Sequence, residues 1–253
     1  MKIIRVVILI SILIFVAFYS KLQMLESTSW TQALAVSVYP INGDGSEQVA
    51  RYIKEIQAND YNGIETFLRA EYLKYDEFSQ HPVELTLEEE LFELPPAPPI
   101  SRNIFTVVFW SLNMRWWSYQ HANSANKTQV NIYVIYYQPK DGLRLAHSLG
   151  LQKGLIGVVN AFASKENAKQ NNVVIAHELL HTVGATDKYN LQTGQPIFPV
   201  GFAKPEEKYN QSKAELMAGR IPINEIESEM PYSLRYCVVG AQTAKEIGWL
   251  DNN

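Results

Sequence analysis

The segment NNVVIAHELLHTVGATDKY, residues 171–189, constrains the fold more than any other part of the chain. Its apolar residues recur at helical spacing and predict a helix with one face in a core; they are Val173, Val174, Ala176, Leu179, Leu180 and Val183. Because residues four apart share one face of a helix, His177 and His181 can direct two imidazoles at one ion. A buried helix without a metal would need the same apolar residues, so the remaining polar residues must separate the two interpretations.

Those residues complete the pattern H-E-x-x-H-x-x-G-x-x-D. Glu178 follows His177 and is placed to deprotonate a metal-bound water rather than to bind the metal. Gly184 can adopt the left-handed conformation that ends a helix and reverses the chain, which would bring Asp187 back towards the ion. The spacing therefore predicts a zinc (Zn²⁺) site with His177, His181 and Asp187 as ligands and Glu178 as catalytic base.

This pattern resembles the active-site signature of the metzincin clan of zinc endopeptidases, in the snapalysin-type variant that has aspartate as third ligand. The resemblance implies an α+β, zincin-like fold in which a twisted mixed sheet packs on helices, including the H-E-x-x-H helix. It also implies hydrolysis of peptide bonds and a methionine in a tight turn beneath the metal, for which Met217 is the candidate. The tyrosine that follows this methionine in some of these families is absent, because Ala218 and Gly219 stand there.

Alternatives stay open for both the function and the ligands. A zinc hydrolase of a non-peptide amide, such as a cell-wall crosslink, would use the same metal and base. A membrane-tethered binding module with structural zinc would have no use for Glu178 beside an open coordination position. A rival third ligand is a later glutamate, from the set Glu206, Glu207, Glu215 and Glu225. The other histidines match no ligand spacing and are expected to be structural; they are His81, His121 and His147.

The N-terminus has the pattern of a membrane segment. Lys2 and Arg5 precede an apolar run, and no small-residue cleavage site follows closely. This favours an uncleaved anchor over a signal peptide, and the positive residues before the run keep the N-terminus in the cytoplasm. We therefore expect a transmembrane helix in residues 1–25 and a metallopeptidase domain in residues 26–253, single-pass, with that domain on the extracytoplasmic side.

Composition narrows the partners. A net charge of −4 without a cluster of Lys and Arg excludes nucleic acid, so the expected partners are a peptide or protein substrate and, through the N-terminal helix, the membrane. The single cysteine, Cys237, excludes an intramolecular disulfide and is expected to be buried.

The remaining pattern predicts alternating strands and helices. Strands are expected at 33–41, 129–137 and 154–162, and helices from Ser46, over 63–75, over 104–121 and near the C-terminus. The aromatic helix over 104–121 is expected to be buried. The strand over 154–162 is expected to be the cleft edge that an extended peptide substrate joins.

Overall fold

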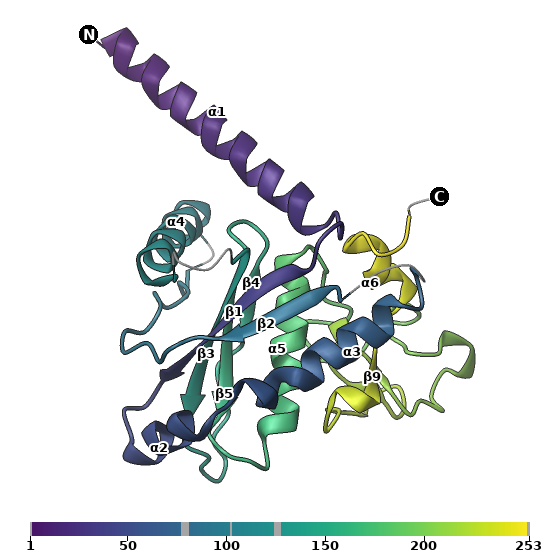
Figure 1. Cartoon of the computed structure of the whole chain (residues 1–253). Coiled ribbons are helices and arrows are strands. Elements are labelled where there is room, and N and C mark those ends of the chain that lie inside the picture. The colour runs from purple at the N-terminus through teal and green to yellow at the C-terminus, as the bar shows by residue number, and fades with distance from the viewer. Residues whose placement is uncertain (1, 77–80, 102, 124–127, 252–253) are drawn as a thin grey trace.

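The fold is a mixed α/β arrangement with one five-stranded sheet (Figure 1). The computed structural model describes residues 2–76, 81–101, 103–123 and 128–251. The sheet has the order β2-β1-β3-β5-β4. Its strands are β1 (Leu34–Asn42), β2 (Val83–Leu87), β3 (Val130–Tyr137), β4 (Leu149–Leu151) and β5 (Ile156–Phe162). β1, β2, β3 and β5 are mutually parallel, and β4 pairs antiparallel with β5.

Helices lie on both faces of the sheet. The α-helices of the described chain are α1 (Lys2–Ser27), α2 (Glu47–Glu55), α3 (Asn62–Tyr72), α4 (Ile104–His121), α5 (Ala168–Thr182) and α6 (Ala241–Glu246). Of these, α2, α3 and α5 pack on one face and α4 on the other, whereas α1 projects away from the sheet (Figure 1). Side chains alternate along β3, so Ile132 and Val134 join the main core with α2, α3 and α5, whereas Tyr133 and Ile135 face the smaller core beneath α4. The two cores hold the sheet between the helical layers.

Most of the predicted elements are confirmed. The strands expected at 33–41, 129–137 and 154–162 are β1, β3 and β5, and each predicted helix is present. Ser46 starts α2 as expected, because its hydroxyl accepts a hydrogen bond from the backbone N–H of Val49 at 3.3 Å. The sequence analysis missed β2 and β4. β4 spans only three residues and contains Gly150, which leaves no alternation to detect.

The predicted cleft edge was assigned to the wrong strand. β5 lies between β3 and β4, so both of its edges are already paired. The edge strand on this side is β4, which has β5 as its neighbour in the sheet. An apolar run such as 154–162 is typical of an interior strand buried on both faces, and this pattern should have argued against an edge position.

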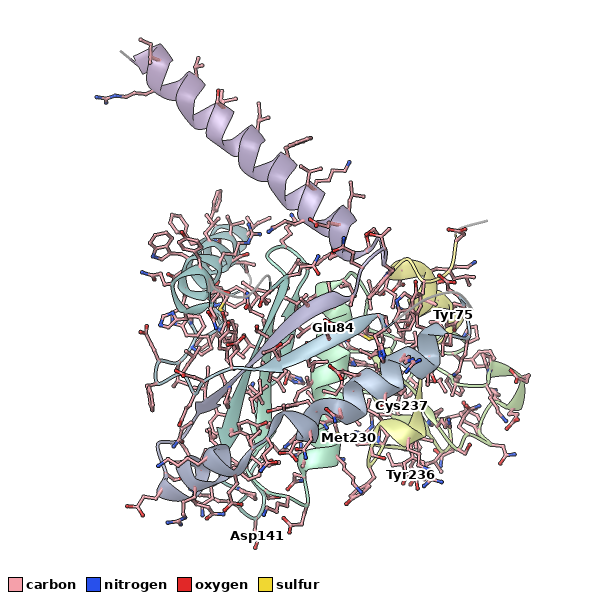
Figure 2. The ribbon with its side chains drawn as sticks, viewed as in Figure 1. Tyr75, Glu84, Asp141, Met230, Tyr236 and Cys237 are labelled. Atoms are coloured by element: carbon pink, nitrogen blue, oxygen red, sulfur yellow. The ribbon has the colours of Figure 1, made fainter. Side chains whose placement is uncertain are left out.

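The prediction that the helix over 104–121 is buried was also wrong. Within α4 only Met114, Trp117 and Ser118 are buried, and Figure 2 shows side chains projecting outward around this helix. Met114 and Trp117 pack on residues of the sheet, including Tyr133. Only one side of the helix contacts the sheet. The apolar residues on its other sides therefore stay exposed, although the helix is apolar around its whole circumference.

The N-terminal segment is helical from Lys2 to Ser27, as expected for this part of the chain. Among the residues that the structure describes, no helix combines the length and the hydropathy needed to cross a membrane. The membrane anchor stays a prediction. Cys237 is 1% exposed, which confirms that it is a buried residue (Figure 2).

Candidate metal centre

α5 carries the two histidines and ends as the sequence predicts. Its buried residues, Val173, Ile175, Ala176, Leu179 and Leu180, fix the helix in the main core. After Thr182 the backbone N–H of Gly184 donates to the His181 carbonyl at 3.1 Å, and that of Ala185 donates to the Leu180 carbonyl at 3.0 Å. These are the two bonds of a Schellman motif, and Gly184 has the positive φ of 108° that the motif requires. The predicted helix stop at Gly184 is therefore confirmed.

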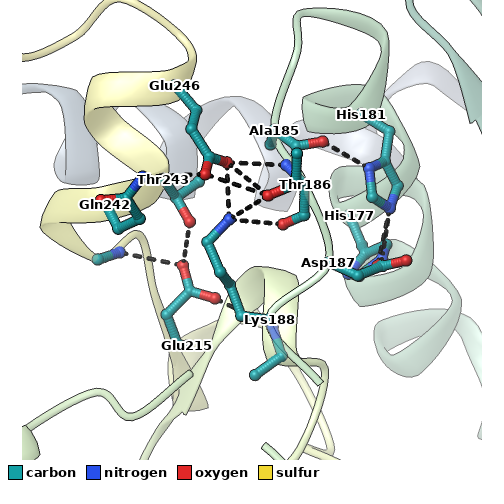
Figure 3. Close-up of polar contacts among 12 residues, drawn as sticks. His177, His181, Ala185, Thr186, Asp187, Lys188, Glu215, Gln242, Thr243 and Glu246 are labelled. Carbon is teal, nitrogen blue, oxygen red and sulfur yellow. Dashed lines mark hydrogen bonds and ion pairs between the residues drawn. The ribbon is translucent and has the colours of Figure 1, made fainter. Parts of the chain in front are cut away.

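Beyond this stop, the chain brings Asp187 to the two histidines. His177 Nε2 lies 3.0 Å from His181 Nε2, and Asp187 Oδ1 lies 3.0 Å from His181 Nε2 and 3.3 Å from His177 Nε2 (Figure 3). Tetrahedral ligands at zinc distances of about 2.0–2.1 Å stand roughly 3.3 Å from one another. The three atoms thus form a triangle of the size that a zinc ion needs, and all three residues match the predicted ligands.

Backbone carbonyls orient both rings. His177 Nδ1 lies 2.9 Å from the Leu216 carbonyl oxygen, and His181 Nδ1 lies 2.7 Å from the Ala185 carbonyl oxygen. Only a protonated Nδ1 can donate to these oxygens, so in the neutral rings each Nε2 carries a lone pair. Both lone pairs face Asp187. This is the arrangement of metal-ligating histidines whose second nitrogen is held by a backbone acceptor.

The charges of this cluster are strongly coupled. Burial lowers the pKa of His177, but the bond to Asp187, the Glu178 charge and the Leu216 carbonyl together raise it above its ordinary value. Burial raises the pKa of Asp187, but the two histidines outweigh it and hold this pKa well below its usual range. Two imidazole lone pairs and a carboxylate at these distances repel one another, so the cluster favours a bound cation or proton.

Glu178 lies beside the ligands in a different setting. Its side chain is buried, with 5% exposure, and burial raises the pKa of its carboxyl. Within the described part of the chain, Glu178 Oε2 has no hydrogen-bond partner. Glu178 and His177 line a cavity of about 600 Å³. A buried carboxylate oxygen without a partner is costly, and its position at a cavity wall points to a group that binds there.

The turn that contains Met217 packs against α5, the helix that carries the two histidines. Met217 is fully buried in a 3-10 turn, Leu216–Ala218, and Gly219 follows with a positive φ of 67°. The same turn supplies the Leu216 carbonyl that accepts from His177. Met217 therefore lies in a tight turn that supports a histidine of the site, and its role as the methionine of a metzincin-type turn stays a prediction.

Glu215, a rival third ligand, is committed elsewhere. Its carboxylate accepts from Thr243 Oγ1 at 2.7 Å, from the backbone N–H of Ala218 at 3.0 Å and from that of Gly240 at 3.2 Å (Figure 3). Among the residues that the structure describes, no glutamate joins the ligand group. The geometry thus favours Asp187 over every glutamate considered as third ligand.

The loop that presents Asp187 is clamped on both sides. Lys188 is 3% exposed, and its ammonium donates to Glu246 Oε2 at 2.6 Å, to the Thr186 carbonyl at 2.7 Å and to Thr186 Oγ1 at 2.8 Å (Figure 3). The backbone N–H of Thr186 also donates to Glu246 Oε2, at 2.8 Å. The neighbours of Asp187 in the chain are thus tied to α6, which leaves the Asp187 carboxylate free to face the histidines.

Two further residues line the same cavity. His147, expected to be structural, precedes β4 and lies at the cavity wall with Glu178. Tyr189 lies there too, with its ring centroid 6.5 Å from that of His177. His147 stands thirty residues before His177, so no local spacing could have revealed the proximity. It depends on how β4 packs beside α5.

Comparisons with known proteins yield limited likeness. No protein-family model matches the chain, and no curated protein matches it. Among solved structures, a chain from a chaperone–substrate complex has 14% sequence identity and a TM-score of 0.40 over 85% of this chain. OgpA from Akkermansia muciniphila has 13% identity and a TM-score of 0.38 over 84% of this chain. The alignments span 33% and 58% of the length of those two chains.

Proposed function

We propose that this chain is a zinc-dependent metallopeptidase with a zincin-like fold of the metzincin type. One observation carries the proposal. Three converging ligand atoms, on His177, His181 and Asp187, lie beside Glu178, whose buried Oε2 has no partner in the described part of the chain, and His177 and Glu178 line a cavity. Ligands alone would suit a structural ion, whereas the unliganded carboxylate beside them supports catalysis.

The donor set fits zinc. Two neutral imidazoles and one carboxylate are three of the ligands that catalytic zinc takes, and the fourth position is then open. His177, His181 and Asp187 would hold this ion, which when bound would lower the pKa of a water and polarise the carbonyl group of a substrate. The backbone carbonyls of Leu216 and Ala185 hold the two histidine rings so that each Nε2 faces the position of the metal.

Glu178 supplies the proton transfers. Its carboxylate takes the proton of the attacking water and passes it to the leaving amine of the peptide. Burial raises the pKa of Glu178, which makes its carboxylate a stronger base than an exposed glutamate. This role uses the Oε2 atom that is otherwise without a partner in the described chain.

An extended peptide is the substrate that suits the cleft. β4 is an edge strand, and an extended chain can add to such an edge through backbone hydrogen bonds. Gly150 of β4 packs against α5, where a side chain would run into His181 Cβ and the Glu178 carbonyl oxygen. A peptide paired with β4 would therefore run close to the proposed zinc ligands. This supports an endopeptidase rather than a hydrolase of small amides.

The membrane anchor belongs to the same proposal. Residues 1–25 would hold the chain in the membrane, with the domain formed by residues 26–253 on the extracytoplasmic side. Trp30 follows α1 directly, and its indole N–H donates to the Ile247 carbonyl at 2.6 Å, which ties the segment after the helix to the domain. An anchored peptidase of this form would act on substrates that reach the outer surface of the membrane.

The test combines metal analysis with hydrolysis. The purified full chain should contain one equivalent of zinc and cleave a library of internally quenched peptides. Removal of the metal by a chelator should abolish cleavage, and added zinc should restore it. A chain that binds zinc but cleaves no peptide would instead support the structural-zinc alternative, and a chain that binds no zinc would reject the proposed site.

A further inference from the structure

The first half of α4 projects from the protein. All six residues from 104 to 109 are exposed, although five of them are apolar. Phe105 and Phe109 are 75% and 76% exposed, and in the segment before the helix Ile100 has no cover at all, with a relative exposure of 103%. The helix is fixed beyond these six residues, by Met114 and Trp117 in the smaller core and by Trp110, which packs on that core and donates its indole N–H to the Pro96 carbonyl at 2.9 Å.

Exposure on every side limits what can cover this helix. Another protein helix or groove covers one stripe, as the sheet does for Met114 and Trp117. Six consecutive exposed residues occupy more than one full turn, so a single protein face cannot cover them all. An apolar liquid that surrounds the helix can cover all six residues. The acyl chains and headgroup boundary of a lipid bilayer form such a medium.

The aromatic residues of α4 suit the boundary of a bilayer. Trp116 and Tyr119 are 59% and 77% exposed, and their rings stack with centroids 5.9 Å apart. They follow the apolar half of the helix and carry polar groups that need water. Tryptophan and tyrosine concentrate at the membrane–water interface because each ring combines an apolar body with one polar atom.

The charge of this region is complementary to anionic lipid. The chain as a whole has a net charge of −4, yet no Asp or Glu occurs between Glu93 and Asp141. Within or close to α4 in the sequence, this stretch contains the basic residues Arg102, Arg115 and Lys127. Glu93 pairs with His121 at the C-terminal end of the helix, at 3.3 Å, away from the projecting half. A segment without acidic residues is not repelled by anionic headgroups and is attracted through its basic ones.

We propose that α4 is a membrane-contacting helix, which inserts its N-terminal half into the surface of an anionic bilayer. In the view of Figure 1, α4 stands at the upper end of the sheet, and α1 leaves the domain at the upper end as well. The contact is independent of zinc and of hydrolysis. It adds a second attachment point to the proposed anchor and fixes the orientation of the domain on the membrane.

A site-specific label tests this contact in the full chain. Cys237 is buried, so a cysteine introduced as Phe109→Cys can be labelled selectively with an environment-sensitive fluorophore. The labelled chain is added to vesicles of equal parts phosphatidylcholine and phosphatidylglycerol that contain a nitroxide lipid. The matched control is Arg51→Cys, on an exposed position of α2 whose side chain is 70% exposed. Both substitutions lie on the surface and should leave the fold intact.

The label at position 109 should shift to the blue and be quenched several-fold more than the label at position 51. Equal quenching at the two positions would overturn the proposal. A blue shift that appears without lipid and grows with protein concentration would also overturn it, in favour of contact with a second copy of the chain. Vesicles of phosphatidylcholine alone should quench less, and equal quenching in both kinds of vesicle would contradict the preference for anionic lipid.

Discussion

Lys188 Nζ lies 2.6 Å from Glu246 Oε2, and this partly buried ion pair joins the loop that carries Asp187 to α6. The two residues are 58 positions apart. The Glu246 carboxylate also accepts hydrogen bonds from the backbone and the hydroxyl of Thr186. The position of the proposed third ligand therefore depends on a carboxylate that is not itself part of the candidate metal centre.

Replacement of this carboxylate should destabilise the protein. Glu246→Gln removes the charge opposite Lys188, and hydrogen bonds to charged groups contribute about 1.5–3 kcal/mol each. The free energy of unfolding at neutral pH, measured with urea, should fall by an amount of that order. Glu47→Gln is the control, because the Glu47 side chain is 94% exposed, and it should change little.

The same pair predicts how this loss depends on pH. Burial raises the pKa of Glu246, but the bonds from Lys188 and Thr186 outweigh it and hold the pKa below the ordinary value of 4.5. A carboxyl with a lowered folded pKa stabilises the fold fully above its unfolded pKa, and this contribution is lost as the pH falls through the folded pKa. The gap between wild type and Glu246→Gln should shrink below pH 4.5. A gap that widens on acidification would contradict the assigned pair.

At Gly150, β4 lies close against α5. A methyl group there would meet His181 Cβ and the Glu178 backbone, so Gly150→Ala must push β4 away from α5. Overpacking of this kind costs about 1–3 kcal/mol of stability. If peptides bind along β4, kcat/KM should fall further than the stability loss explains. Gly63→Ala is the control, because a side chain there would meet only Asn172 Nδ2, at 4.0 Å, and unaltered kinetics in both variants would remove β4 from the substrate site.

The sequence predicts the local geometry of the site well because that geometry is local. The spacing of His177 and His181 follows from one helix, and the return of Asp187 follows from the positive φ at Gly184. The features of the site that the sequence does not reveal depend on contacts between segments that are far apart in the chain. Lys188 is adjacent to Asp187 in the chain but pairs with Glu246, and His147 reaches the cavity through the packing of β4.

The burial of α4 was mispredicted for a related reason. Its apolar residues continue around the whole helix, a pattern that fits a fully buried helix and a helix in a lipid environment equally well. Composition cannot distinguish these two surroundings. The structure shows that α4 is not fully buried, because Met114 and Trp117 meet the sheet whereas residues 104–109 are exposed.

The identity of the third ligand is tested by substitution. Asp187→Ala should lose most of the bound zinc, whereas Asp187→His should retain much of it, because imidazole is an equally acceptable zinc ligand. Glu215→Ala should keep its zinc if it folds, since the Glu215 carboxylate is bound to Thr243 and to backbone N–H groups. Zinc per chain, measured by mass spectrometry after dialysis, distinguishes the assignments. Zinc retained in Asp187→Ala and lost in folded Glu215→Ala would reverse them.

The most direct test of the account is the zinc content and the peptide hydrolysis of Glu178→Gln, measured on the same preparation. Glutamine keeps the size of the side chain but cannot take a proton, and removal of a general base typically slows catalysis by roughly 10²–10⁴-fold. Because Glu178 is not among the three ligands, we predict one zinc per chain and hydrolysis reduced by that factor. Full activity with zinc bound, or loss of the zinc together with the activity, would contradict the role of Glu178 as the unliganded base.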